Sequence, residues 1–149
     1  FHDEYPALFP GPESARLAAN TQLIDRFLAE ISDRLEALAR KRPGSYLVHG
    51  HCHQKSFAAF DDTLRALGSF GDASAIESSC CGMAGHFGYQ SGHHDVSIAM
   101  AELDLLPAIR AADDTTTIVA TGTSCRQQIR HGTGRNALHP IQVIASAIA

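Results

Sequence analysis

Apolar and polar residues follow a helical period near the start of the chain. From Pro12 onward, apolar side chains recur at steps of three and four, which predicts one long N-terminal helix with a buried apolar face. Proline suits the first turn because its φ is already helical, and Glu13 lies favourably at the positive end of the helix dipole. The face comprises Leu17, Thr21, Ile24, Leu28, Ile31, Leu35 and Leu38. We expect it to pack on the sheet of its own domain, and the alternative is docking to another domain or subunit.

Farther along the chain, short apolar runs alternate with helical patterns. Strands are predicted at residues 45–49, 74–78, 115–121 and 136–139. Helices are predicted at residues 55–67, at 93–112 with an interruption at Pro107, at 124–130, and from Pro140 to the end. Strands that alternate with helices predict an α/β fold, here a small parallel sheet of about four strands flanked by helices.

The length of 149 residues suits one domain that can bury a core of its own. Residues 1–12 resemble a linker because proline and glycine are frequent there, so we expect the domain to span residues 13–149. The chain begins with Phe1 instead of methionine, and we expect it to be the C-terminal part of a larger protein.

Composition narrows the class of protein further. Charged residues make up 19% and apolar residues 44%, as in an ordinary globular domain, and no apolar run is long enough to span a bilayer. The net charge of −4 comes without a basic stripe, which argues against nucleic acid as a partner. Cysteines without a signal peptide favour a reducing compartment, so we expect a cytoplasmic protein whose membrane association, where it occurs, comes through partners.

The cysteines carry the candidate chemistry. Cys80 and Cys81 are adjacent, and their Cα spacing of about 3.8 Å is shorter than an unstrained disulfide spans. Cys52 and Cys125 are the other two cysteines, separated from the pair by residues 53–79 and 82–124. Each follows a predicted strand, and the carboxyl ends of parallel strands share one edge of a sheet. We therefore expect all four thiols to converge there on a metal or an iron–sulfur cluster.

Residues beside the cysteines extend this candidate site. His51 and His53 flank Cys52 and are candidate metal ligands or donors to a ligand, and the alternative is that they have no role in the site. His49 is expected to be a packed or solvated strand residue. Gly82 and Gly85 allow the backbone to approach a cofactor closely, with amides that can point at sulfur atoms.

These loops resemble the cysteine-rich CCG domain. The matching residues are His51-Cys52-His53, Cys80-Cys81-Gly82-Met83-Ala84-Gly85 with Phe87-Gly88, Thr123-Ser124-Cys125-Arg126 with Gln128-Ile129, and Leu138-His139-Pro140. That domain occurs in iron–sulfur subunits of heterodisulfide reductase, glycolate oxidase and anaerobic glycerol-3-phosphate dehydrogenase. It also forms the C-terminus of FAD-linked oxidases of the D-lactate or D-2-hydroxyglutarate dehydrogenase type, to which the similarity, over residues 47–149, is greatest.

The resemblance implies an iron–sulfur electron-transfer domain of an FAD-dependent 2-hydroxy-acid oxidoreductase. A flavin dehydrogenase domain or subunit would hold FAD and oxidise the substrate, while this domain, not itself catalytic, would relay electrons to an acceptor that the sequence leaves open. The family's fullest form ends in Cys-x-x-Cys, but Gly122 occupies the first of those positions here. Four thiolates still complete the ligand shell of a [4Fe–4S] cluster, and Cys52, Cys80, Cys81 and Cys125 are its expected ligands.

Three other functions fit the same residues. The four cysteines, or three of them with His51 or His53, would also bind zinc in a structural or regulatory module. Cys125 at a helix start could serve as the nucleophile of a thiol enzyme, which would leave the Cys80–Cys81 pair unexplained. The third of these functions is docking to a partner, by a module that has lost its cluster.

Overall fold

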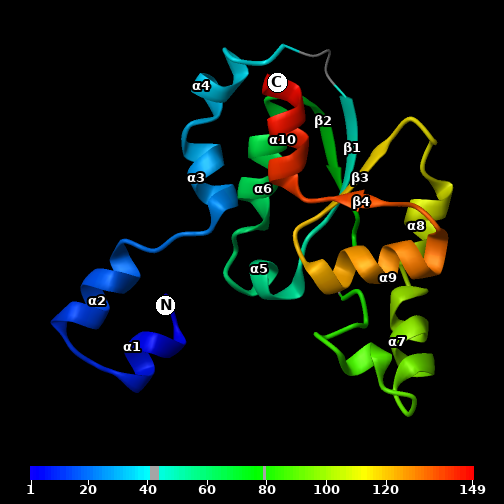
Figure 1. Ribbon diagram of the computed structural model, residues 1–149, viewed down its shortest axis with the longest axis horizontal. Coiled ribbons are helices and arrows are strands. Elements are labelled where there is room, and N and C mark those ends of the chain that lie inside the picture. The colour runs from blue at the N-terminus through cyan, green and yellow to red at the C-terminus, as the bar shows by residue number, and fades with distance from the viewer. Residues whose placement is uncertain (41–43, 79) are drawn as a thin grey trace.

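A computed structural model describes residues 1–40, 44–78 and 80–149 (Figure 1). Within these residues the chain folds into ten α-helices, one 3₁₀ helix and four strands, which confirms the predicted α/β class. The strands are β1 (Gly44–His49), β2 (Gly71–Ala75), β3 (Thr117–Ala120) and β4 (Ala137–Leu138). They form one sheet in the order β2-β1-β3-β4, and every neighbouring pair is parallel. The predicted four-stranded parallel sheet is thereby confirmed.

The helices connect and cover these strands. Four short helices precede the sheet: α1 (Glu4–Leu8), α2 (Pro12–Ala19), α3 (Ile24–Glu30) and α4 (Ser32–Glu36). The connections hold α5 (Cys52–Ser56), α6 (Phe60–Gly68), the 3₁₀ helix η1 (Phe87–Tyr89), α7 (His94–Ala101), α8 (Leu105–Ala111) and α9 (Thr123–Thr133), and the chain continues from β4 into α10 (Pro140–Ile148).

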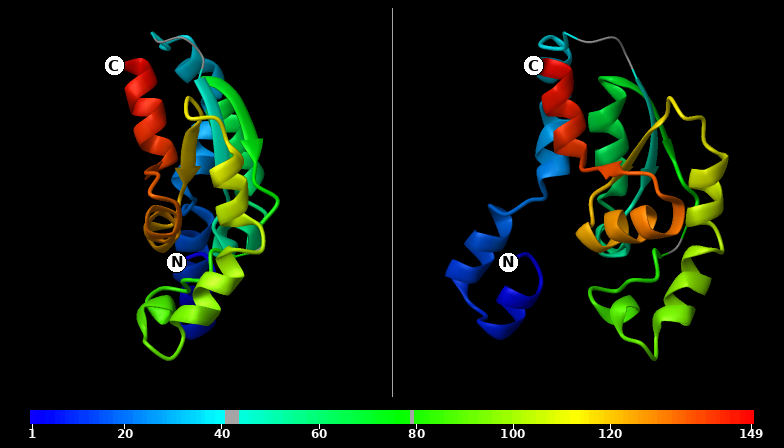
Figure 2. Two further views of the ribbon diagram at one scale, coloured as in Figure 1. Left: turned by 90° about the vertical axis from the view of Figure 1, so that its right-hand side faces the viewer. Right: turned by 45° about the vertical axis from the view of Figure 1, so that its right-hand side comes forward.

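Apolar side chains fill both faces of the sheet. On one face, residues of α3, α4, α6 and α10 pack against Tyr46 and Val48 of β1 and Val119 of β3. On the other face, residues of α8 and α9 pack against Ile118 of β3, and this second cluster contains Cys81 and Cys125. Figure 2 shows the sheet between the two helical layers. Because successive strand residues point to opposite faces, both layers are anchored on the same strands.

The long N-terminal helix predicted from Pro12 is wrong, because this stretch forms three separate helices. Between α2 and α3, the side chains of Asn20 and Thr21 hydrogen-bond to the carbonyls of Arg16 and Leu17, which ends α2 instead of continuing it. The expected buried face is correspondingly interrupted. Its buried members are Leu28 and Leu35, whereas Leu17, Ile24 and Leu38 are exposed.

Several boundaries also differ from the prediction. The helix expected at residues 55–67 is two helices, and Ala58 between them adopts a left-handed φ of 51°, which no α-helix accommodates. The strand expected at residues 74–78 lies earlier, at Gly71–Ala75, because it is paired residue for residue with Gly44–Val48. The pattern at residues 93–112 is divided between α7 and α8, and Pro107 lies in the first turn of α8, where proline is tolerated.

Helices α1 and α2 lie apart from the sheet at the N-terminal end (Figure 1). They bury only Ser14 between them, and α1 contacts chiefly α2. Several large apolar side chains here are exposed, among them Leu8 and Phe9. None of the helices in the described ranges is long and apolar enough to cross a membrane.

Candidate metal centre

Three loops meet where β1, β2 and β3 end. The loop after β1 leads into α5 at Cys52, the loop after β2 carries Cys80 and Cys81, and the loop after β3 leads into α9 with Cys125 in its first turn. All four cysteines are free thiols. Parallel strands present their carboxyl ends at one edge, which explains why cysteines so distant in sequence gather in one place.

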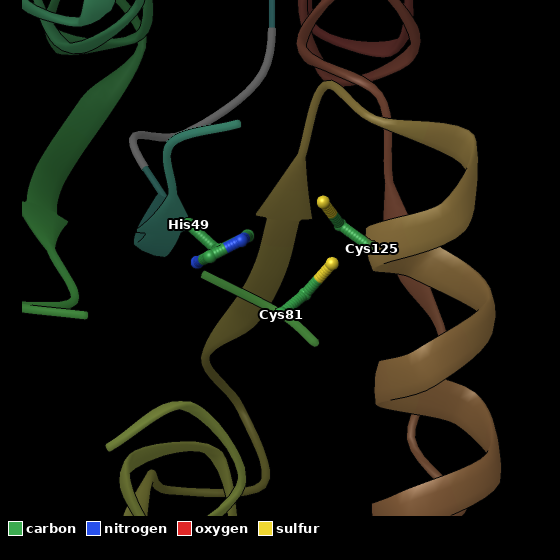
Figure 3. Close-up of side chains that lie close together, drawn as sticks. All are labelled: His49, Cys81 and Cys125. Carbon is green, nitrogen blue, oxygen red and sulfur yellow. The ribbon is translucent and has the colours of Figure 1, made fainter. Parts of the chain in front are cut away.

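The inner part of this centre is made of His49, Cys81 and Cys125. One ligand atom from each lies within 4.8 Å of the others, and all three residues are buried (Figure 3). In a tetrahedral metal site, sulfur ligands at about 2.3 Å from the ion lie about 3.8 Å apart. The three side chains are therefore spaced closely enough to bind one ion with small adjustments.

His49 is the last residue of β1 and is 1% exposed. Its Nδ1 atom lies 2.9 Å from Oγ of Ser78, so one ring nitrogen has a hydrogen-bond partner. Its Nε2 atom is buried and makes no hydrogen bond of regular geometry among the described residues, although the His49 side chain interacts with Cys81 closely enough to lower the pKa of that thiol. In Figure 3 one ring nitrogen points toward the two sulfur atoms and the other away from them. A buried polar atom without a partner costs about 1–3 kcal/mol, which a bound metal would remove.

The thiols of Cys81 and Cys125 shift each other's pKa in opposite directions. The hydrogen bond from Cys125 is the largest cause that lowers the pKa of Cys81, and His49 and the backbone N–H of Met83 lower it further, against the effect of burial. The same hydrogen bond, followed by burial, raises the pKa of Cys125. One member of the pair is thus disposed to be a thiolate, which is the form that binds metals.

Cys52 and Cys80 form the outer part of the centre. Cys52 is exposed and Cys80 half-buried, and Sγ of Cys80 accepts a hydrogen bond of 3.3 Å from the backbone N–H of Gly82. Burial raises the pKa of Cys80, the N–H of Gly82 opposes it, and the charges of Cys81 and Cys52 raise it further. Cys52 and Cys80 also raise the pKa of Cys125, so the four sulfur atoms lie within electrostatic reach of one another.

The glycines after the cysteine pair adopt conformations that favour glycine. Gly82 has a φ of +83°, and a Cβ atom there would lie 2.1 Å from the carbonyl oxygen of Ser97. Gly85 has a φ of +71°, and its carbonyl accepts a hydrogen bond from the side chain of Ser124 in the first turn of α9, next to Cys125. These two residues let the chain turn sharply after the cysteine pair, and Gly85 contacts the start of α9.

Gly122 leaves room for His51. A Cβ atom at Gly122 would lie 2.5 Å from Cδ2 of His51 and 2.9 Å from Sγ of Cys125. Nδ1 of His51 accepts a hydrogen bond from the N–H of His53 at the start of α5, and burial lowers the pKa of His51. Both histidines also line a cavity of about 260 Å³ beside the centre.

Two cations hold the loops by their carbonyl groups. The ammonium group of Lys55 donates to the carbonyl of Ser78, shortly before the cysteine pair, and lies over the ring of Phe60. The guanidinium group of Arg126 donates to the carbonyls of Ala120 and Thr121, at the end of β3. Both residues therefore fix the backbone around the thiols.

His49 is the member of this arrangement that the sequence did not predict as a site residue. Strand alternation contains the signal that would have found it. Leu47 and His49 share a face of β1, and Leu47 packs against the cluster that contains Cys81 and Cys125.

The comparisons with known proteins point to dehydrogenases. No family model matches the chain, and no solved structure matches it. The D-2-hydroxyglutarate dehydrogenase of Escherichia coli K12 is 28% identical over an alignment that covers 99% of this chain and 14% of that protein. One subunit of the anaerobic glycerol-3-phosphate dehydrogenase from the same strain is 26% identical over 99% of this chain and 37% of its own length. The D-2-hydroxyglutarate dehydrogenase of Pseudomonas putida is 29% identical over 76% of this chain and 11% of the relative.

The chain therefore spans well under half the length of each of these relatives. The aligned region covers 99% of this chain in the first two comparisons and 76% in the third. The chain is distantly related to dehydrogenases and to a dehydrogenase subunit.

Proposed function

We propose that this chain is the iron–sulfur electron-transfer domain of an FAD-dependent 2-hydroxy-acid oxidoreductase. In this proposal residues 13–149 form a CCG-type domain, and Cys52, Cys80, Cys81 and Cys125 bind a [4Fe–4S] cluster. The observation that supports it best is the position of four free thiols just after the strands at one sheet edge, where Cys81, Cys125 and the buried imidazole of His49 lie within 4.8 Å of one another.

The donor atoms fit such a cluster. Cysteine thiolates are the usual ligands of iron–sulfur centres, and four of them complete the shell of a [4Fe–4S] cluster, which supplies one-electron transfer when bound. The chain's own residues prepare the site for it. The N–H of Gly82 already points at Sγ of Cys80, and hydrogen bonds to sulfur are one of the ways a protein sets a cluster's reduction potential.

The flavin in this proposal belongs to another part of the protein or to another subunit. Two of the relatives are D-2-hydroxyglutarate dehydrogenases of which this chain matches a small part, and a third is one subunit of a dehydrogenase. The flavin dehydrogenase part would oxidise the 2-hydroxy acid, and this domain would accept the electrons singly and pass them on. Its own residues bind and orient the cluster and perform no hydride transfer.

Anaerobic reconstitution with iron and sulfide tests the proposal. We expect the protein to take up about four iron and four sulfide per chain, the content of one [4Fe–4S] cluster, and to give an EPR signal after one-electron reduction. Replacing Cys80 or Cys81 by serine should abolish incorporation because each supplies one of the ligands. His94→Ala serves as the control, since His94 is exposed at the start of α7. A wild-type protein that holds no iron would disprove the proposal.

A structural zinc site is the second candidate function. The close spacing of His49, Cys81 and Cys125 favours it, because three donors around one point suit a single small ion. The protein purified from cells without added metal distinguishes the two functions. Stoichiometric zinc, no visible absorption and no gain of iron on reconstitution would favour the zinc module over the electron-transfer domain.

A further inference from the structure

Among the buried polar groups of the centre in the described part of the chain, Nε2 of His49 is the one that makes no hydrogen bond of regular geometry. We infer that His49 is a metal ligand of this centre through Nε2, and that the hydroxyl of Ser78 fixes its ring for that role. The inference rests on the single-ion site given above as the second candidate function, where His49 takes one of the four positions around the metal. A [4Fe–4S] cluster bound by all four cysteines would leave no position for it.

A purely structural role for this imidazole would cost free energy, because a buried polar nitrogen is removed from water. His49 is 1% exposed and lies beside the second core cluster, where a leucine or valine would pack at no polar cost. The ring instead places a nitrogen beside the Cys81–Cys125 pair, within 4.8 Å of both sulfur atoms. A metal at this point would use the lone pair of Nε2 and the two sulfur atoms together.

The partner of the second ring nitrogen supports this role. A histidine that binds metal through Nε2 must carry its proton on Nδ1, and it usually donates that proton to a fixed acceptor. Nδ1 of His49 lies 2.9 Å from Oγ of Ser78, which is itself buried. A hydroxyl can either donate or accept, so Ser78 can satisfy Nδ1 both before and after metal binding.

The backbone places Ser78 where this bond needs it. The N–H of Ser78 donates to the carbonyl of Ile76, and its own carbonyl accepts from the ammonium group of Lys55. Ser78 is thus held from both sides. The bond between Ser78 and His49 therefore joins the end of β1 to the loop that carries Cys80 and Cys81.

Cobalt titration tests the inference, because Co²⁺ substitutes for zinc or ferrous iron in sulfur and nitrogen sites and reports its ligands by absorption. Wild type should bind Co²⁺ with a sulfur-to-cobalt charge-transfer band and show one strongly shifted exchangeable proton in its NMR spectrum, from Nδ1–H of His49. His49→Asn keeps a side-chain amide near Ser78 but has no atom at the place of Nε2. We expect its affinity for Co²⁺ to fall by more than about 100-fold and the shifted proton to disappear.

Ser78 variants supply a second test that leaves the ligand itself in place. Ser78→Ala should weaken Co²⁺ binding by about 10-fold to 100-fold, since loss of a hydrogen bond to a ligand has that effect, and the shifted proton should exchange faster with water. Ser78→Thr keeps the hydroxyl and should retain an affinity close to wild type. If circular dichroism shows that His49→Asn is unfolded, the comparison of Ser78→Ala with Ser78→Thr tests the inference in its place.

The possible failures can be told apart. Equal Co²⁺ affinity in wild type and His49→Asn, or in Ser78→Ala and Ser78→Thr, overturns the inference and leaves the proposed function intact if wild type still takes up iron and sulfide. A shifted exchangeable proton that persists in His49→Asn also overturns it. Wild-type protein that binds neither Co²⁺ nor iron overturns both.

Discussion

Gly122 is the residue that sets how closely His51 approaches the thiols. Its hydrogen atoms face Cδ2 of His51 and Sγ of Cys125, and a Cβ atom would lie 2.5 Å and 2.9 Å from them. Real Cβ atoms do not make such contacts, so at least one of the two side chains has to move when position 122 carries a side chain. Gly122 therefore has a steric role of its own beside the candidate centre.

Gly122→Ala should accordingly disturb the centre. We expect a loss of about 1–3 kcal/mol in the free energy of unfolding of the metal-free protein, as for other overpacked sites, and reduced iron per chain after reconstitution. Urea unfolding and iron analysis measure the two effects. Gly92→Ala is the matched control, because no atom lies within 4 Å of a Cβ at that position. Normal iron content in Gly122→Ala would show that the contact with His51 is unimportant for metal binding.

The positions of the cysteines after the strands were predictable, and the burial of His49 beside two of them was not. Sequence shows that each cysteine follows a strand, and parallel topology then brings strand ends together whatever the details of the loops. Whether a strand histidine is buried, and beside which residues, depends on the packing of α8 and α9 on that face of the sheet. Periodicity alone does not distinguish such a residue from a solvated one.

At the scale of elements, a buried polar network joins α3 to the loops of the centre. Gln54 in α5 donates to Oδ2 of Asp25 in α3 at 2.9 Å and to the hydroxyl of Thr63 in α6, and it accepts from the hydroxyl of Thr121 after β3. Asp25 is 4% exposed, and its Oδ1 atom is buried without a partner among the described residues. Burial raises its pKa above the ordinary value of 3.8, although His139, Thr63 and Gln54 oppose the shift.

The raised pKa of Asp25 predicts a pH dependence of stability. The folded protein binds this proton more tightly than the unfolded chain, so the resulting stabilisation is complete below pH 3.8 and is lost as pH rises through the folded-state pKa. Asp25→Asn stays neutral and escapes this loss. We therefore expect the difference in unfolding free energy between Asp25→Asn and wild type to shift in favour of the variant as pH rises.

Urea unfolding of the metal-free proteins between about pH 4 and pH 7 measures this difference. Asp3→Asn is the control, because Asp3 is exposed before α1 and makes no side-chain capping bond. This variant shows what the loss of one exposed carboxylate does over the same range. A flat profile for Asp25→Asn would mean that Asp25 titrates equally in the folded and unfolded states.

The sheet was more predictable from the sequence than the helices. Strands β1, β3 and β4 lie within or close to their predicted ranges because short apolar runs between turn residues mark them locally, and in β3 the run is rich in β-branched residues. The N-terminal helices were mispredicted because apolar spacing continues through residues 20–23, where the side chains of Asn20 and Thr21 end the helix. The spacing of apolar residues shows which face of a helix is buried, whereas local side-chain hydrogen bonds determine where the helix ends.

Over the whole molecule, helices α1 and α2 contribute little to the folded core. Deleting residues 1–19 should change the free energy of unfolding by less than about 1 kcal/mol, since Ser14 is the one buried residue in these two helices. Leu28→Ala in α3 should cost about 2–5 kcal/mol, because Leu28 is 5% exposed within the first core cluster. Urea unfolding of both proteins gives the comparison. A large loss on deletion would assign these helices to the core.

The placement of the candidate ligands after three different strands has a consequence for the lifetime of the protein, if the proposed metal site is filled. A metal bound by Cys52, Cys81 and Cys125 ties together segments that 28 and 43 intervening residues separate in the sequence (53–80 and 82–124). A metal that cross-links these segments restricts the unfolded chain as a disulfide does. Unlike a disulfide, this cross-link is lost when a chelator is present or metal is scarce. Cellular proteases act on opened chains, so the abundance of this protein should follow the supply of metal as well as the rate of its synthesis.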